Sequence, residues 1–476
     1  MLGSIATGFG GLALNTMLTE EARADGVAAA PPLSSRTPHL PARAKRIIFL
    51  FMQGGVSHVD TFDHKPELDR FDGKPPPFKR TRVKFATRGN LMRSPWEFRP
   101  CGDSGLPMSE LWQHLPDVAD DICMIHSVCE TNVAHGGATM KLHCGDETFV
   151  RPSMGSWISY GLGTENRNLP SFITICPSSL HGGVNNWGAA FLPAIHQGVP
   201  LGAPGWPNSR SEGARFRDMT PTLSKKQQRL QLDLLANLQR SRREHTGADR
   251  NLEARIQSFE LAFRMQLAAP EVMDISKESR ATRALYGLDD ETTKDFGRQC
   301  LLARRFAESG VRFIQVNHSG SLRTLGIPTN EQWDQHSFLV KGHSINARQV
   351  DKPMTGLIQD LKSRGLLDET LILWGGEFGR TPTTEVRDDK REVGRDHHTD
   401  GFTMWLAGGG VKGGFRYGKT DDFGYYTVED RCTLHDLHAT ILHLMGLDHT
   451  RLTYQHAGRD FRLTDVYGKV ATKIIA

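Results

Sequence analysis

The chain has 476 residues, and its 58 lysines and arginines exceed its 54 aspartates and glutamates only slightly, for a formal net charge of +4. So small an excess over so long a chain excludes the basic footprint of a nucleic-acid-binding protein. A mean hydropathy of −0.42, with no charge-free run of about 18 strongly apolar residues, excludes a multi-span membrane protein.

The N-terminus has the pattern of an export signal. Residues 2–18 (LGSIATGFGGLALNTML) are weakly apolar and uncharged, and small residues follow before Pro31 and Pro32 open a loop. The low hydropathy favours the twin-arginine route, although the basic start of such a signal is missing. We expect residues 1–44 to be a truncated export signal and linker of a periplasmic or extracellular protein, with no membrane span in the mature form. The alternative is a cytoplasmic protein with a loosely packed N-terminus.

The first part of the chain predicts short buried strands that lead into loops. Residues 45–52 (KRIIFLFM) are a continuous apolar run before Gln-Gly-Gly, which is typical of a buried parallel strand. Further strands are expected at 122–128 and 172–176, with a helix at 136–144, whereas 64–110 looks irregular. The seven cysteines contain no CxxC pair, so we expect neither a disulfide framework nor a zinc knuckle.

The middle of the chain changes character twice. Residues 180–220 are rich in Gly and Pro without a clear period, which predicts a long surface excursion. Residues 224–268 have helical spacing broken at Thr246 and Gly247, which predicts a helical hairpin with Ser224 as its N-cap. We therefore expect an insertion at about 180–292 within a single domain of residues 45–476.

The last part alternates predicted helices with apolar strands. Helices are expected at 293–309, 337–364 and 434–445, and strands at 311–316, 371–374 and 402–407. This alternation predicts an α/β fold with a doubly wound, mostly parallel sheet flanked by helices.

Polar residues follow several of these strands, at the edge of the sheet where ligands bind in such folds. They are Ser57, His58, Asp60, Asp63, Asn132, His135, His143, His318, Asp334, His336, His343, Glu377, Arg380, Arg395, Asp396, His397 and His398. Carboxylates and imidazoles from different strand ends are the donors of a divalent metal site: both suit Zn, Mn, Fe or Mg, whereas Ca would use oxygens only. Arg380 and Arg395 suit a phosphate or sulfate oxyanion, although a structural ion pair explains either one equally well.

In order along the chain, several segments resemble the domain of unknown function 1501 family, a sulfatase-like group abundant in planctomycetes. These segments are GGVSHVDTFDHKP (54–66), RPSMGSWISYGLGTENRNLPSFI (151–173), WDQHSF (333–338), GLLDETLILWGGEFGRTP (365–382), GRDHHTDGFTMWLAGGGVKGG (394–414) and HDLHATILHLMGLDH (435–449). That family is in turn similar to the alkaline-phosphatase-like superfamily. The resemblance implies an alkaline-phosphatase-like core and a two-metal hydrolase whose nucleophile lies at a helix N-terminus.

The superfamily pattern maps onto this chain imperfectly. The position expected for a Ser, Thr or Cys nucleophile falls on His135, which would be a metal ligand or a histidine nucleophile; Thr131 and Thr139 are weaker substitutes. The expected Asp-His pair falls on Glu377 and Phe378, and the Asp-x-x-x-His falls on Asp334 with His336 only two residues on. The aspartate expected directly after the first strand is replaced by Gln53 and Gly54, with Asp60 nearest. No cysteine stands in a sulfatase signature.

The sequence therefore predicts an exported metal-dependent hydrolase of phosphate or sulfate esters, acting on a small-molecule or polysaccharide substrate and holding one or two divalent ions (Zn, Mn, Fe, Mg or Ca). The expected metal ligands are Asp60, Asp334, His336, Glu377, His397 and His398, and the expected catalytic residues are His135 and the anion clamp Arg380. The alternative is a non-catalytic metal-binding or cell-surface protein that keeps the fold.

Overall fold

The computed structural model describes residues 33–79, 87–205, 210–217, 223–246, 250–320, 322–327, 329, 332–386 and 392–476. The expected export signal at residues 2–18 lies outside this part of the chain. No helix within it is both long enough and apolar enough to cross a membrane.

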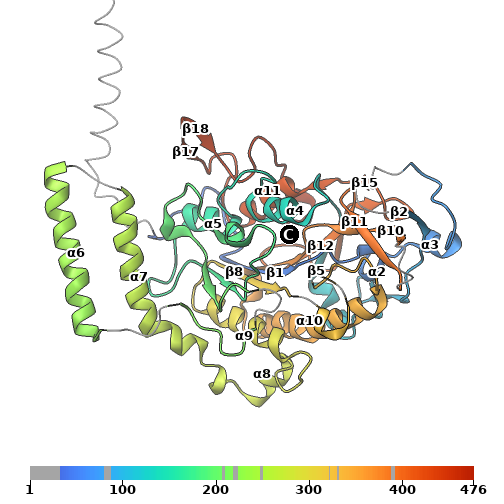
Figure 1. Cartoon of the computed structure of the whole chain (residues 1–476), viewed down its shortest axis with the longest axis horizontal. Coiled ribbons are helices and arrows are strands. Elements are labelled where there is room, and N and C mark those ends of the chain that lie inside the picture. The colour runs from blue at the N-terminus through green and yellow to red at the C-terminus, as the bar shows by residue number, and fades with distance from the viewer. Residues whose placement is uncertain are drawn as a thin grey trace, which may run out of the picture.

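A central sheet of nine strands organises the described part of the molecule (Figure 1). The strands pair in the order β13-β5-β12-β9-β1-β8-β6-β7, with β16 also on β5, and every neighbour is parallel except β12, which runs antiparallel to β5 and β9. They are β1 (Arg46–Met52), β5 (Ile122–Cys129), β6 (Phe172–Ile175), β7 (Val199–Leu201), β8 (Phe313–His318), β9 (Thr370–Gly375), β12 (Phe402–Ala407), β13 (Phe415–Tyr417) and β16 (Cys432–Thr433). The predicted α/β class with a mostly parallel sheet is confirmed.

Helices cover both faces of this sheet, with α4, α5 and α11 on one side and α9 and α10 on the other (Figure 1). The helices are α2 (His58–Thr61), α3 (Pro66–Arg70), α4 (His135–Cys144), α5 (Met154–Leu162), α6 (Lys225–Thr246), α7 (Arg250–Met273), α8 (Arg280–Leu285), α9 (Lys294–Glu308), α10 (Leu339–Ser363) and α11 (Leu434–Leu444). All seven residues of β1 are buried, and alternate side chains enter the two cores, Ile48 and Leu50 on one side and Ile47 and Phe49 on the other. This double burial explains why the strand is a continuous apolar run.

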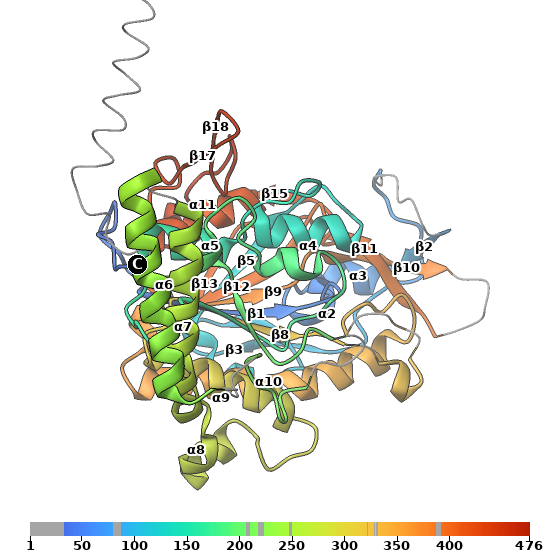
Figure 2. The same ribbon diagram turned by 60° about the vertical axis from the view of Figure 1, so that its left-hand side comes forward.

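The helical hairpin is confirmed as α6 and α7, which stand at one end of the body (Figure 2). The backbone N–H of Gln227 donates to the Ser224 hydroxyl (3.3 Å), and the backbone N–H of Ser224 donates to the Gln227 side chain (3.1 Å). This reciprocal pair is a capping box, so Ser224 is the predicted N-cap.

The expected surface excursion at 180–220 is wrong for its middle part. Trp187, Leu192 and Leu201 are buried, and β7 joins the edge of the central sheet in parallel with β6. These apolar anchors are too widely spaced among Gly and Pro residues to produce a period, which is why the sequence pattern missed them.

A second, antiparallel sheet was not predicted, and it carries part of the functional site. It has the order β11-β10-β2, formed by β11 (Gly394–His398), β10 (Gly379–Val386) and β2 (Thr87–Leu91). The register places Arg380 opposite His397. The remaining strands are β3 (Phe98–Cys101), β4 (Leu106–Ser109), β14 (Lys419–Thr420), β15 (Thr427–Glu429), β17 (Tyr454–His456) and β18 (Arg459–Phe461).

Candidate metal centre

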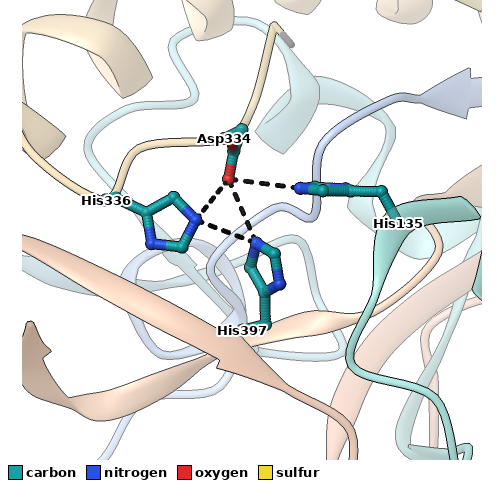
Figure 3. Close-up of side chains that lie close together, drawn as sticks. All are labelled: His135, Asp334, His336 and His397. Atoms are coloured by element: carbon teal, nitrogen blue, oxygen red, sulfur yellow. Dashed lines mark hydrogen bonds and ion pairs between the residues drawn. The ribbon is translucent and has the colours of Figure 1, made fainter. Parts of the chain in front are cut away.

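Three histidines and one aspartate converge beyond the carboxyl ends of the central strands (Figure 3). His135 is the first residue of α4, Asp334 and His336 lie in the loop between β8 and α10, and His397 lies on β11. One ligand atom from each of the four lies within 4.8 Å of all the others. We call these four residues the open cluster, because each side chain is 10–18 % exposed.

The distances within the open cluster centre on one carboxylate oxygen. Asp334 Oδ1 lies 3.4 Å from His135 Nε2, 3.0 Å from His336 Nε2 and 3.2 Å from His397 Nε2. The two Nε2 atoms of His336 and His397 are 3.0 Å apart. A metal that binds tetrahedrally with bonds of about 2.0–2.1 Å separates its ligand atoms by roughly 3.3–3.4 Å. The donor spacing is therefore close to that of a small divalent ion's ligand shell.

The other nitrogen of each imidazole faces a group that only accepts hydrogen bonds. His135 Nδ1 lies 2.7 Å from Glu377, His397 Nδ1 lies 2.7 Å from the carbonyl oxygen of Val133, and His336 Nδ1 contacts Glu385. Carboxylates and carbonyls cannot donate, so each ring donates from Nδ1, and its neutral form carries a lone pair on Nε2. Metal-binding histidines are typically oriented by such partners.

The consequence is that four lone-pair-bearing atoms face one another. This arrangement is repulsive unless protons on the imidazoles or a cation lie among them. Burial lowers the pKa of His336, but hydrogen bonds to Asp334 and Glu385 outweigh it and raise the pKa above its ordinary value. Burial, together with the nearby His135 and Arg380, holds the pKa of His397 well below its ordinary range. The donor set fits a divalent metal with imidazole preference.

Asp334 is held in place by a buried arginine. Arg380 Nη2 lies 2.7 Å from Asp334 Oδ1, and its Nε donates to the carbonyl oxygen of Gly55 (2.9 Å). Burial tends to raise the pKa of Asp334, but Arg380 and the three imidazoles outweigh it and hold the pKa well below its ordinary range. The carboxylate is therefore ionised and available as a ligand.

The turn after β1 packs against the loop that carries Asp334. Gly54 has a φ of +114°, and a Cβ there would lie 2.7 Å from the backbone nitrogen of Asp334. Its backbone N–H donates to both carboxylate oxygens of Glu377, at 3.0 and 3.2 Å. Glycine therefore allows β1, the Asp334 loop and Glu377 to pack without a gap.

Two histidines of α11 anchor the helix that carries His135. His435 Nε2 donates to the carbonyl oxygen of Gly145 (2.8 Å) and His438 Nε2 to that of Leu142 (2.8 Å). Both acceptors lie at the C-terminal end of α4, where the helix leaves its carbonyls unpaired. These histidines therefore pack against α4 and cap its end.

Several of the predicted site residues lie beside the open cluster and not in it. Glu377, expected as a metal ligand, is fully buried and contacts the far nitrogen of His135. Arg380 is fully buried on backbone carbonyls and Asp334, so its expected contact with a substrate anion stays a prediction. Arg395 forms the structural ion pair that was its alternative reading, with Nε 2.6 Å and Nη2 2.9 Å from the two oxygens of Asp60. Asp60, also expected as a metal ligand, thus forms an ion pair with the Arg395 guanidinium.

His397 and His398 illustrate how the strand selects one of two neighbours. Adjacent residues on a strand point to opposite faces, so only one of them can reach the cluster. His397 does so, whereas His398, also expected as a metal ligand, donates from Nε2 to the carbonyl oxygen of Tyr425 (2.5 Å) and is buried.

The sequence reading missed the partners supplied by the small antiparallel sheet. Glu385 on β10 orients His336, and Asp396 on β11 lies 3.9 Å from His336 Nδ1. His336, Glu385 and Asp396 form a second group of possible metal donors beside the first. The His181 ring also lies near His135, tilted by 30° with ring centroids 5.0 Å apart. Asp396 and the neighbouring Arg395 were among the polar strand-end residues, but Glu385 follows a segment that had no predicted strand.

Comparison with known proteins identifies the family. Residues 44–475 match the model of the family described as "Protein of unknown function (DUF1501)", and the chain belongs to that family. No curated protein matches the chain.

Solved structures of similar fold share little sequence with the chain. A lipoteichoic acid synthase, LtaP, from Listeria monocytogenes is 10% identical, with 90% of this chain and 78% of that chain covered at a TM-score of 0.33. The PsFucS1 sulfatase from Pseudoalteromonas sp. is 13% identical, covering 87% and 68% at a TM-score of 0.34. A protein in the alkaline phosphatase superfamily from Vibrio parahaemolyticus is 9% identical, covering 88% and 71% at a TM-score of 0.35. Similarity at this level carries no argument about activity or catalytic residues.

Proposed function

We propose that this member of the DUF1501 family binds a divalent metal ion through His135, Asp334, His336 and His397 and hydrolyses phosphate or sulfate esters. The observation that carries the proposal is the convergence of three Nε2 atoms, each with its Nδ1 fixed by an acceptor, on one ionised carboxylate. Three imidazoles favour Zn, Mn or Fe over Mg and Ca, which prefer oxygen ligands.

The residues around the ion suit ester chemistry. When bound, the ion would supply Lewis acidity that stabilises negative charge on an ester oxygen. His135 starts α4, so the positive end of the helix dipole adds to the attraction for an anion. Arg380 keeps Asp334 ionised, and Glu377 and Glu385 hold two of the imidazoles in orientation. Each of the four side chains is 10–18 % exposed, so the cluster is in contact with solvent.

A second candidate function is a non-catalytic metal-binding or cell-surface protein. It is favoured by the chemistry at the expected nucleophile position, where His135 faces Asp334 as a fourth donor. The weaker substitutes lie elsewhere, since the Thr131 hydroxyl donates to Glu147 (3.0 Å) and Thr139 is fully buried. An enzyme of this kind would need water as its nucleophile.

The proposal is tested by metal analysis and an ester panel. Purified protein is assayed for bound metal by mass spectrometry, and apo protein is reloaded with Zn, Mn or Fe(II) and offered aryl phosphate and aryl sulfate esters. We expect about one to two ions per chain and metal-dependent turnover that is lost in His397→Ala. His398→Ala is the matched control, because the same residue type one position on lies outside the cluster. Metal binding without turnover of any ester favours the second candidate, and absence of metal uptake contradicts both.

We also propose that the protein acts outside the cytoplasm, on the basis of the uncharged, Gly- and Ala-rich stretch at residues 2–18. Export is tested by fractionating cells that express the chain with and without residues 2–18. Deletion of this stretch should retain the protein inside, and full export of the deletion variant would contradict the proposal.

A further inference from the structure

A fourth imidazole lies against the open cluster without belonging to it. His181 follows the carboxyl end of β6, and its ring is tilted by 30° against that of His135, with the centroids 5.0 Å apart. Its Nδ1 lies 4.0 Å from the position that a Cβ on Gly136 would take, in the first turn of α4. His181 therefore lies over the start of the helix that carries His135, although it belongs to the stretch 180–220 that the sequence assigned to a surface excursion.

The backbone holds His181 in a conformation that side chains rarely adopt. Its φ is +42°, and Gly182 and Gly183 follow at +88° and +49°. A left-handed conformation is unfavourable for a residue with a Cβ, and it is found most often at ligand and active sites. Buried Asn186 fixes this turn, because its Nδ2 donates to the carbonyl oxygen of His181 (3.0 Å) and a Cβ on Gly182 would clash with its Oδ1. The turn thus keeps the imidazole in place at a cost in backbone energy.

The rings around His135 differ in what they can offer a ligand. The Phe378 centroid lies 4.9 Å from that of His135, and the His397 centroid lies 4.4 Å from it. Phe378 is apolar and 1 % exposed, whereas His397 is itself one of the four converging donors. His181 is half-buried and lies outside the donor set. Of these three rings, only His181 combines access to solvent with a polar group that the cluster does not use as a donor.

The charge of the cluster favours an anion at this place. A single carboxylate, Asp334, offsets only half the charge of a divalent ion, and three neutral imidazoles offset none of it. The charged residues beside the cluster face its ligands, because Glu377 contacts His135, Glu385 contacts His336, and fully buried Arg380 bonds to Asp334. A bound anion therefore needs a donor from another part of the chain, and an imidazole is such a donor.

We propose that His181 is a substrate-contacting residue of the open cluster and donates a hydrogen bond from its imidazole to the oxyanion of a phosphate or sulfate ester. The inference rests on the proposed function in that an ion must occupy the cluster, but it does not require the ester to be hydrolysed. Only the His135 ring separates the His181 ring from the converging ligand atoms, so an oxyanion on the ion lies within its reach. Since the backbone already holds the ring there, binding costs less conformational entropy.

The experiment is calorimetric titration of inorganic phosphate into the full chain, whose bound metal is measured first by mass spectrometry. His181→Gly removes the imidazole and suits the left-handed backbone. We expect phosphate to bind this variant at least tenfold more weakly than the parent protein, with the metal content and the unfolding midpoint unchanged. Free imidazole added to His181→Gly should restore part of the affinity, which a purely structural role of His181 would not allow.

The matched control is Ala457→Gly, in the turn between β17 and β18. Ala457 is exposed and has a φ of +47°, so this variant makes the same backbone change without removing a polar group. We expect its phosphate affinity to equal that of the parent protein. A tenfold loss in this control as well would overturn the inference, because the backbone change alone would then explain the effect.

Three further results would overturn the contact. They are phosphate that binds folded, metal-loaded His181→Gly as tightly as the parent, a metal-loaded parent that binds no phosphate at millimolar concentrations, and loss of the metal from His181→Gly, which would make His181 a support of the ion. Failure of the proposed function has a different signature. A parent that hydrolyses no ester, but whose phosphate affinity depends on His181, rejects hydrolysis and supports the contact; a parent that takes up no metal rejects both.

Discussion

Two histidine-rich regions of this molecule use the same side chain for opposite purposes. In the open cluster, His135, His336 and His397 turn their Nε2 atoms toward one carboxylate oxygen. In the closed group, which we define as His58, His126, His398 and Asp63, the rings are buried and bond to separate partners. His58 Nε2 donates to the carbonyl oxygen of Gly424 (2.8 Å), and His126 Nδ1 lies 3.1 Å from the Thr403 hydroxyl.

The difference teaches that convergence, and not abundance, makes histidine functional. In the closed group each ring places one nitrogen against a partner of its own, and burial lowers the pKa values of His58, His126 and His398, so they remain neutral. The open cluster instead points its rings at one position, where a proton or a cation must lie among their lone pairs. A metal site requires the second arrangement.

The largest expected effect comes from His397→Ala, which removes one donor from the open cluster. We expect stoichiometric metal binding and any ester turnover to be lost, while the free energy of unfolding of the apo protein changes little. The comparison is His398→Ala, for which we expect retained metal and a loss of about 2–4 kcal/mol in stability, since a buried, hydrogen-bonded ring is removed. Metal loss in both variants would break the distinction between the two regions.

The next effect concerns Asp60, which the sequence placed among the metal ligands. Asp60→Ala leaves the Arg395 guanidinium buried and unpaired, so we expect a loss of about 3–5 kcal/mol in the free energy of unfolding. Chemical denaturation of the apo protein measures this loss. Metal content should remain that of the parent protein, and an Asp60 variant that is stable but metal-free would return this residue to the ligand set.

The closed group should make stability depend on pH. Burial lowers the pKa of His58 to about 4, against about 6.5 in the unfolded chain, so the unfolded state binds more protons between these values. The free energy of unfolding should therefore be highest above pH 6.5 and fall as the pH drops toward 4, by roughly 3 kcal/mol from this residue. Urea denaturation between pH 4 and 8 tests this, with His58→Asn expected to flatten the profile; an unchanged slope would contradict it.

The smallest effect is expected from Glu377→Gln, which weakens the orientation of His135 without removing a ligand. Changes to such supporting residues typically cost about 10–100-fold in metal affinity. Competition with a chelator measures the affinity. Thr131→Val is the control, because the Thr131 hydroxyl donates to Glu147, away from the cluster. If Glu377→Gln abolished metal binding outright, Glu377 would be a direct ligand, as the sequence predicted.

Much of the fold was predictable because the buried strands carry an unambiguous signal. The runs at 45–52 and 402–407 are apolar throughout, and they are β1 and β12 of the central sheet. The polar residues that follow the strands marked the correct edge of the sheet, the one formed by the carboxyl ends of the strands. His135, Asp334, His336 and His397 were therefore all among the candidates.

The rest depended on contacts that no local pattern encodes. The β2-β10-β11 sheet pairs strands from distant parts of the chain, so Glu385 gave no sign that it would support His336. Similarly, the choice between His397 and His398 follows from the face of β11 that meets the Asp334 loop.

The sequence positions of the four donors set the order of events during maturation. His135 and His397 are separated by about 260 positions, and the two remaining donors lie in a loop between them. Such a site cannot assemble on a growing chain until β11 (Gly394–His398), in the last quarter of the sequence, has been made, because β11 supplies one of the donors. Metal loading should thus be a late, post-folding event, and a chelator should strip the ion while the surrounding α/β body keeps its circular dichroism spectrum.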